Sequence, residues 1–246
     1  MQRACLLLAL VASALVGRHS PRRCNVPAYF SPLSPRHSCS LRGTGAHDCG
    51  CVILNDGWIL TSATCSDVAL GLTHTVHVGS NHINEGGVVY NVGRVTKHEQ
   101  YDAMNISSPD IAVKETIVWS PSVQPAVLPM QNGTVPADSI GTIIGWGWTA
   151  EEGPVSPQLL EAEQRVLSDA ECQSSFTFTG ANHLCSVGTT ASSGFCKKDE
   201  GGPLIVNGVV EGLMSWTNTQ CSSDTMPGVY MRIASYRDWI QAQTGA

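Results

Sequence analysis

The sequence predicts an all-β fold, and three observations lead to this prediction. The chain of 246 residues contains 24 glycines and 13 prolines, and no long stretch repeats apolar residues with the period of a helix. Short apolar runs recur between turn-forming residues, which is typical of sandwiches and barrels. With 42% hydrophobic and 14% charged residues, the composition suits a packed globular core and differs from that of disordered chains.

The expected strands begin with a hairpin. Residues 49–54 and 58–61 flank the turn Asn55-Asp56-Gly57, and an Asp-Gly pair favours a tight connection between antiparallel strands. The Pro-, Ser-, His- and Arg-rich stretch before this hairpin, residues 18–48, is expected to be irregular. Further strands are expected at residues 74–78, 88–95, 111–113, 126–128, 139–147, 160–167, 203–206, 209–216 and 228–233.

Two helices are expected. Ser168 and Glu171 have the spacing of a capping box, which predicts that a short helix begins there. Near the C-terminus, Ser235 is expected to cap a second helix. Its apolar face is formed by side chains three and four residues apart, at Tyr236, Trp239 and Ile240.

The N-terminus has the features of a secretory signal. Arg3 precedes an apolar run at residues 4–16, and Ala12-Ser13-Ala14 fits a cleavage site for signal peptidase. This run is too short for a typical membrane span. We therefore expect a signal peptide at residues 1–17, cleaved at about 14–17, a short pro-segment at 18–23, one domain at 24–246, and secretion.

The charge and the cysteine count narrow the function classes. The formal net charge is −6, and residues 1–23 contribute four arginines and no acid, so the secreted domain is more acidic still. Nucleic acid and membrane insertion are therefore not expected. The chain has ten cysteines, which fits an oxidising compartment. Nine remain once Cys5 leaves with the signal, and this odd number indicates a free thiol or a bridge to another chain.

Several motifs follow one another in a recognisable order. Residues 194–204 read G-F-C-K-K-D-E-G-G-P-L, and W-I-L-T-S-A-T-C, D-I-A-V, G-W-G, S-W and P-G-V-Y begin at positions 58, 110, 145, 215 and 227. From about Cys24 to the C-terminus the chain resembles the trypsin and chymotrypsin family of serine proteases. The resemblance implies two orthogonal six-stranded antiparallel β-barrels with a C-terminal helix, and an active site between the barrels.

The family's catalytic triad falls on Thr64, Asp110 and Glu200, so only the carboxylate matches the His-Asp-Ser pattern. A threonine hydroxyl has no useful basicity near neutral pH. The backbone N–H groups of the oxyanion hole fall on Lys198 and Glu200, where a carboxylate opposes the charge that develops in catalysis. We therefore expect an inactive homologue, a pseudo-protease that is not an enzyme. A new carboxylate pair of Asp110 and Glu200 is the alternative.

The resemblance also places the primary substrate pocket. A trypsin has an aspartate where this chain has Gly194, so no preference for arginine or lysine is implied. Phe195 and Thr217 are bulkier than usual there, which indicates a narrowed or filled pocket, while Phe195 as an ordinary core residue is an equal alternative. The full set of pocket positions is Gly194, Phe195, Ser215, Trp216, Thr217 and Gly228.

A zymogen-like state is expected as well. Active family members pair a new N-terminus with the aspartate at position 199, but cleavage after Arg23 would leave an N-terminus that starts with Cys24 and lacks the usual Ile-Val-Gly-Gly. Ser40, His47 and Asp199 match the residues that hold family zymogens inactive. We expect Asp199 to bond His47; an exposed loop position for His47 is the alternative.

The family pattern implies three disulfides, Cys49–Cys65, Cys172–Cys185 and Cys196–Cys221. Neighbouring strands would allow a fourth between Cys39 and Cys51, which leaves Cys24 free or joined to another chain in a dimer. Asn105-Ile106-Ser107 and Asn132-Gly133-Thr134 are sequons for glycosylation in expected loops. No Cys/His grouping has the spacing of a zinc site, and we expect neither a metal nor a cofactor.

These observations favour a secreted homologue that acts by binding an extracellular protein, as a regulator, cofactor or decoy in a protease or immune pathway. The alternative is a serine-type endopeptidase with residual or altered hydrolase activity. A carrier or storage role is the third hypothesis, and it predicts no saturable binding.

Overall fold

The computed structural model describes residues 35–67, 74–105, 109–110, 112–115, 120–191, 193–217 and 221–246. All of them belong to one compact unit, Leu33–Ala246. The expected signal peptide, the pro-segment and Cys24 lie outside the described residues. In the described ranges no helix is long and apolar enough to span a bilayer.

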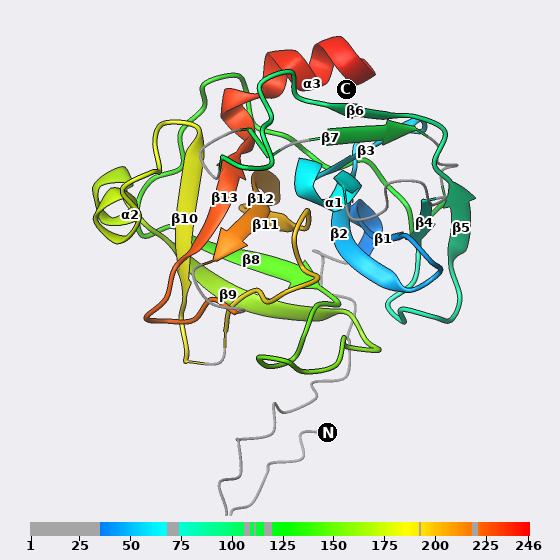
Figure 1. Cartoon of the computed structure of the whole chain (residues 1–246), viewed down its shortest axis with the longest axis horizontal. Helices are drawn as coiled ribbons and strands as arrows, with labels where there is room; N and C mark the ends of the chain where they lie inside the picture. The colour runs from blue at the N-terminus through cyan, green and yellow to red at the C-terminus, as the bar shows by residue number, and fades with distance from the viewer. Residues whose placement is uncertain are drawn as a thin grey trace, which may run out of the picture. The chain divides into compact units, whose positions relative to one another are not determined.

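The first half of the unit forms an antiparallel seven-stranded sheet, at the right of Figure 1. The strand order is β5-β4-β1-β2-β3-β7-β6. The strands are β1 (Ser38–Arg42), β2 (His47–Ile53), β3 (Trp58–Thr61), β4 (Thr75–Val78), β5 (Val88–Asn91), β6 (Val95–Lys97) and β7 (Ala112–Glu115).

The second half forms a closed antiparallel barrel in the order β10-β13-β12-β11-β8-β9. Figure 1 shows it beside the first sheet. Its strands are β8 (Ile140–Gly145), β9 (Leu160–Val166), β10 (His183–Gly188), β11 (Pro203–Val206), β12 (Val209–Thr217) and β13 (Gly228–Arg232). The predicted all-β fold class is confirmed, although the described strands close only the second barrel.

The helices are short. They are α1 (Ala63–Asp67), α2 (Asp169–Ser175), α3 (Arg237–Thr244) and two 3-10 turns, η1 (Pro35–His37) and η2 (Ile233–Ser235). At the start of α2, Ser168 Oγ accepts from Glu171 N and the Glu171 carboxylate accepts from Ser168 N, so the predicted capping box is present. The C-terminal helix begins two residues after the predicted cap, because η2 uses residues 233–235 first.

Three local predictions are wrong. The stretch 18–48, expected to be irregular, contains β1, whose five residues are all buried although they are mostly polar. Burial follows from position: β1 lies between β2 and β4, so both its edges and its side chains are covered. Residues 126–128 form no strand and contribute only an isolated bridge from Val127 to Val209, and β10 was not expected.

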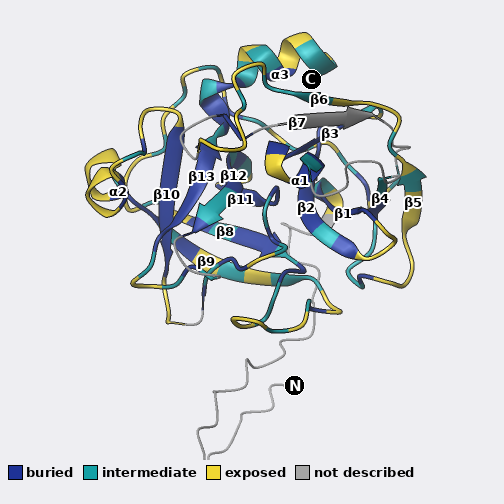
Figure 2. Cartoon of the chain, in the orientation of Figure 1, coloured by how far each residue is buried: buried dark blue, intermediate teal, exposed yellow. Residues whose placement is uncertain are grey.

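The core of the barrel explains how the strands stay together. Figure 2 shows β10, β11 and β13 almost wholly buried, whereas β5 and α2 carry exposed residues. Leu204, Leu213 and Tyr230 are completely covered. Burying side chains of this size contributes about 1.5–3 kcal/mol each, so the barrel is a rigid support for the loops at its ends.

Four disulfides connect described residues. They are Cys39–Cys51, Cys49–Cys65, Cys172–Cys185 and Cys196–Cys221. Three are the pairs implied by the resemblance, and the fourth is the cross-strand pair that the sequence allowed. Cys39 and Cys51 are directly opposite in the β1–β2 register, which brings their side chains to the same face.

Candidate functional site

The structure brings Thr64 and Asp110 together. Asp110 is buried, with 7% exposure, and its Oδ1 accepts from Thr64 N at 2.7 Å and from Thr64 Oγ1 at 3.0 Å. Its Oδ2 accepts from Ser215 Oγ at 2.7 Å. Burial raises the pKa of Asp110, and these hydrogen bonds oppose the rise. Asp110 is thus held as a multiply bonded acceptor that fixes α1 against β12.

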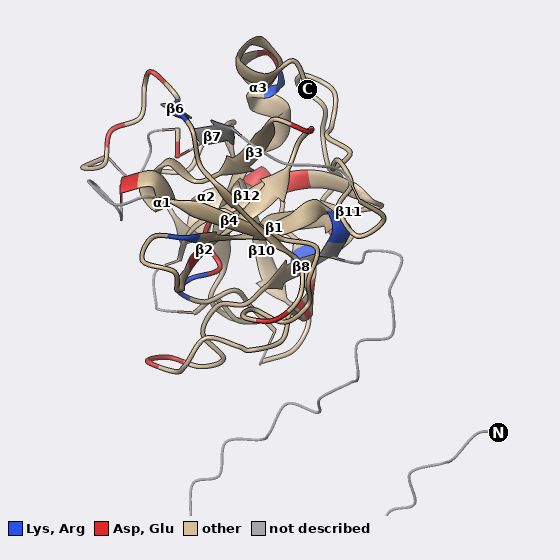
Figure 3. Ribbon diagram, turned by 90° about the vertical axis from the view of Figure 1, so that its right-hand side faces the viewer, with Lys and Arg blue, Asp and Glu red and all other residues tan. Residues whose placement is uncertain are grey.

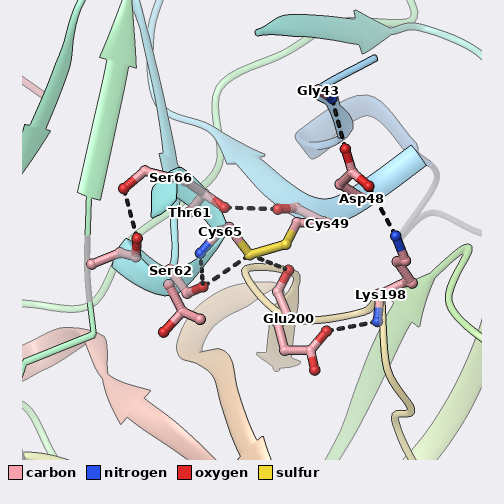
Figure 4. Close-up of a disulfide and its surroundings, with 12 residues drawn as sticks. Gly43, Asp48, Cys49, Thr61, Ser62, Cys65, Ser66, Lys198 and Glu200 are labelled. Atoms are coloured by element: carbon pink, nitrogen blue, oxygen red, sulfur yellow. Dashed lines mark hydrogen bonds and ion pairs between the residues drawn. A yellow bond between two sulfur atoms is a disulfide. The ribbon is translucent and has the colours of Figure 1, made fainter. Parts of the chain in front are cut away.

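Glu200 lies in the loop between Cys196 and β11. Its carboxylate Oε2 accepts from Lys198 N at 2.6 Å (Figure 4), and Lys197 Nζ is 3.7 Å from Oε1. Burial raises the pKa of Glu200, whose side chain is only 15% exposed. The two N–H groups that the resemblance assigned to an oxyanion hole are therefore beside a carboxylate of the chain itself.

Two contacts tie this loop to the first sheet. Lys198 Nζ lies 2.8 Å from Asp48 Oδ1, as Figure 4 shows, and Gly50 N donates to Glu200 O at 2.8 Å. Asp48 and Gly50 both belong to β2, so the loop of the barrel is anchored on a strand of the sheet. No motif in the sequence singled out Asp48.

His47 completes the anchor, and here one part of the zymogen-like network, the expected bond between Asp199 and His47, is wrong. Ser40 Oγ lies 2.8 Å from His47 Nδ1, and His47 Nε2 donates to Lys198 O at 2.9 Å. Both ring nitrogens are thereby used, so His47 does not bond Asp199 as expected. The Asp199 carboxylate instead accepts from Gly147 N at 2.7 Å and Cys196 N at 3.0 Å. His47 is also not an exposed loop residue, since only 5% of it is accessible.

The ring of Phe195 fills space at the predicted pocket. Phe195 is 1% exposed and packs edge-to-face on Tyr230 with ring centroids 5.3 Å apart. A Cβ atom at Gly228 would lie 2.2 Å from Phe195 Cε1, so the ring rests directly on the backbone of β13. Gly194 is equally close to its neighbour, because a Cβ there would lie 1.9 Å from the carbonyl oxygen of Ser222. The two alternatives for Phe195 therefore coincide: it is a core residue at the pocket position.

The remaining pocket positions have different roles. The hydroxyl of Ser215 donates to Asp110 Oδ2. Thr217 is 9% exposed, and its hydroxyl is buried without a described hydrogen-bond partner. Trp216 packs edge-to-face on Phe176 and Phe178, with centroids 5.2 Å apart in each case. This aromatic cluster was not predicted, because Phe176 and Phe178 follow α2 and are forty residues away in sequence.

Tyr101 is a second residue that the sequence did not single out. Its hydroxyl lies 3.4 Å from Thr64 Oγ1 and donates to Asp67 Oδ2 at 3.0 Å. Burial raises the pKa of Tyr101 to about 12, so the phenol stays protonated at neutral pH. Lys97 also pairs with Asp67. These groups surround the exposed Thr64 with polar contacts.

The two asparagines predicted to carry glycans are exposed. Asn105 and Asn132 both lie on the surface, and Asn132 adopts a positive φ of 58° in a turn. Ile106 and Ser107 of the first sequon lie outside the described residues. Among the described residues, no three His, Cys, Asp or Glu side chains are grouped as metal ligands.

Taken together, the site presents a carboxylate, two lysines and aromatic side chains on loops held by the two sheets. Such groups bind polypeptide through hydrogen bonds, ion pairs and apolar contact.

The chain is similar to trypsins of insects. It is 32% identical to Trypsin 5G1 of Aedes aegypti over 214 residues, which cover 84% of this chain and 79% of that protein. It is 35% identical to Trypsin, alkaline B of Manduca sexta over 204 residues, 78% of each chain. Mouse neuropsin, described as a serine protease of the limbic system, superposes with a TM-score of 0.77 at 25% identity, covering 87% of this chain and 96% of neuropsin.

These relatives contradict the prediction that the chain is not an enzyme. The relatives from Aedes aegypti, Manduca sexta and Phaedon cochleariae, 31–35% identical, are all named trypsins. The prediction was based on three positions of the catalytic site, Thr64, Lys198 and Glu200, whereas the similarity to trypsins extends over 78–84% of the chain. We therefore replace the prediction of a non-enzyme with membership in a protease family.

A further structural match shows the fold only: human heparin binding protein superposes with a TM-score of 0.76 at 22% identity, over 86% of this chain and 92% of that one. The sequence model of the trypsin family matches residues 30–240, which include both the sheet and the barrel. The chain belongs to the trypsin family of serine proteases.

Proposed function

We propose that this trypsin-family chain binds an extracellular protein at the surface formed by Thr64, Lys197, Glu200 and Trp216, as a regulator, cofactor or decoy in a protease or immune pathway. The supporting observation is the double anchoring of the loop at residues 197–200. Lys198 is held by Asp48 and His47, and a loop fixed in this way loses little entropy when a partner binds.

Secretion is part of the same proposal. A trypsin-type fold with four disulfides is typical of extracellular proteins. We assign residues 1–17 to a signal peptide, 18–23 to a pro-segment and Asn105 and Asn132 to glycans, on the sequence features described above. Cys24 is the candidate for a bridge to a second chain.

The experiment is site-specific photo-cross-linking in the extracellular fluid of the source tissue. A photoreactive residue replaces Lys197, whose side chain is 53% exposed, and a matched control carries it at Glu161, which is exposed on β9 of the barrel. We expect a discrete, saturable cross-linked protein with the probe at 197 only. Equal labelling from both positions would contradict the proposed surface.

A second candidate is trypsin-type peptide hydrolysis, which the names of the relatives favour. The same samples distinguish the two candidates. Cleavage of mixed peptide substrates, together with fluorophosphonate labelling, supports hydrolysis as the function. An intact cross-linked partner that accumulates with time supports binding.

A further inference from the structure

The side chain of Glu200 folds back onto its own loop. Its Oε2 accepts from Lys198 N at 2.6 Å. A backbone donor of the loop is therefore occupied by a carboxylate of the same loop. A short bond between an N–H and an ionised acceptor is among the stronger hydrogen bonds of proteins.

The backbone around this donor is fixed from several sides. Lys198 has a positive φ of 78°, and its carbonyl accepts from His47 Nε2 at 2.9 Å. The peptide unit that carries the Lys198 N–H is held as well, because its carbonyl, Lys197 O, accepts from Trp148 N at 2.9 Å. The direction of the Lys198 N–H is therefore set before any ligand arrives.

An oriented backbone N–H group beside a cationic side chain attracts an anionic oxygen. In this chain the anion is covalently attached. Lys197 Nζ, 3.7 Å from Oε1, adds a positive charge on the exposed side, so the carboxylate is held from both sides. A ligand oxygen that approaches the Lys198 N–H meets the Glu200 carboxylate first.

We propose that Glu200 is an internal ligand. Its carboxylate occupies the N–H group of Lys198, and an external oxygen ligand, such as a peptide carbonyl or a small carboxylate, binds there only after the side chain of Glu200 moves away. If the external ligand belongs to a protein partner, this inference deepens the proposed function and rests on it. If the ligand is a small carboxylate, the inference does not depend on any partner.

The first test observes the hydrogen bond in 15N-labelled protein. The amide proton of Lys198 should resonate far downfield, because its acceptor is a carboxylate at short distance. Glu200→Gln should move it part of the way upfield, and Glu200→Ala should move it fully. Glu161→Ala, which removes an exposed acidic residue from β9, should leave it unchanged. An identical Lys198 shift in all four proteins would overturn the proposal.

The second test adds acetate as a replacement carboxylate. In Glu200→Ala, acetate should shift the amides of Lys198 and residue 200 in a saturable manner, with an affinity at least about tenfold higher than in the natural protein. Unperturbed amides elsewhere show that the variant is folded. Equal acetate shifts in the natural protein and the variant, or none in the folded variant, would overturn the proposal. No partner protein is used, so failure of the proposed binding function leaves this result unaffected.

Discussion

At the scale of single residues, burial has its clearest effect on the pKa of His47. Both ring nitrogens are hydrogen-bonded, and burial lowers the pKa of His47 from 6.5 to about 4; nearby Lys198 and Arg42 act in the same direction, whereas the bond to Lys198 O and the charge of Asp48 oppose it. The folded protein therefore binds fewer protons at this residue than the unfolded chain does between these pH values. The stabilisation is complete above about pH 6.5 and is lost as the pH falls towards 4.

We expect this loss to appear as a pH-dependent difference between the natural protein and His47→Gln. The free energy of unfolding of the natural protein should fall relative to the variant by on the order of 3 kcal/mol between pH 7 and pH 4. Urea unfolding at several pH values measures it. The raised pKa values of Asp110 and Glu200 change the free energy of unfolding with the opposite sign. Both residues are present in both proteins, so their contributions cancel in the comparison. A difference that stays constant with pH would contradict the prediction.

Phe195 yields a second prediction at this scale. Phe195→Ala removes a fully buried ring between Gly228 and Tyr230 and should lower the free energy of unfolding by about 3–5 kcal/mol. Phe178→Ala is the matched control, because Phe178 is only partly buried and its loss should be smaller. Denaturant unfolding of the two variants gives the comparison, and equal losses would show that Phe195 is not packed as described.

The residue identities at the site could be predicted from sequence motifs, but their contacts could not. The motif at residues 194–204 located Glu200, yet nothing in it indicated that the carboxylate would bond Lys198 N. The bond depends on a positive φ at Lys198 and on His47, about 150 residues away. The expected Asp199–His47 bond failed for the same reason, since alignment to a motif does not choose between alternative hydrogen-bond partners.

At the scale of elements, local signals were reliable where they were strong. The Asp-Gly hairpin and the capping box at Ser168 were both confirmed. β1 and β10 were missed because both consist of wholly buried strands with several polar residues, so neither shows alternation of apolar and polar side chains. The expected strand at 88–95 is divided into β5 and β6, because residues 92–94 pass from one edge of the sheet to the other.

The capping box gives a prediction for α2. Ser168→Ala removes the acceptor for Glu171 N and should lower the free energy of unfolding by about 1 kcal/mol. Gln173→Ala, at an exposed position inside the same helix, is the control and should have little effect. Thermal unfolding followed by circular dichroism measures both. A Ser168→Ala protein as stable as the control would mean that α2 is held by Cys172–Cys185 rather than by its cap.

At the scale of the whole molecule, the acidic excess is not concentrated in one place. The chain has 20 acidic and 14 basic residues, and Figure 3 shows both kinds distributed over several strands and loops. A few charges connect the barrel to the sheet. Lys198 and Asp48 form such a pair, with 34% and 19% of their side chains exposed.

We expect Asp48→Asn to loosen the contact between the two halves locally. An ion pair of this exposure contributes at most about 1 kcal/mol to stability. Hydrogen exchange of the Gly50 amide, which donates to Glu200 O, should become several-fold faster, since that bond lies beside the lost pair. Asp138→Asn breaks the Arg165–Asp138 pair on the barrel surface and should leave Gly50 unchanged. Unchanged exchange in Asp48→Asn would show that the Lys198–Asp48 pair does not contribute to anchoring the loop.

An equilibrium binding isotherm for the protein that cross-links at position 197 tests the proposed protein-binding function most directly. The purified partner is titrated against the natural chain, against Trp216→Ala at the site and against Glu161→Ala on the barrel. We predict saturable binding with one partner per chain, weakened in Trp216→Ala and unchanged in Glu161→Ala. Binding that does not saturate, or that is the same in all three proteins, would contradict a protein-binding function at this surface.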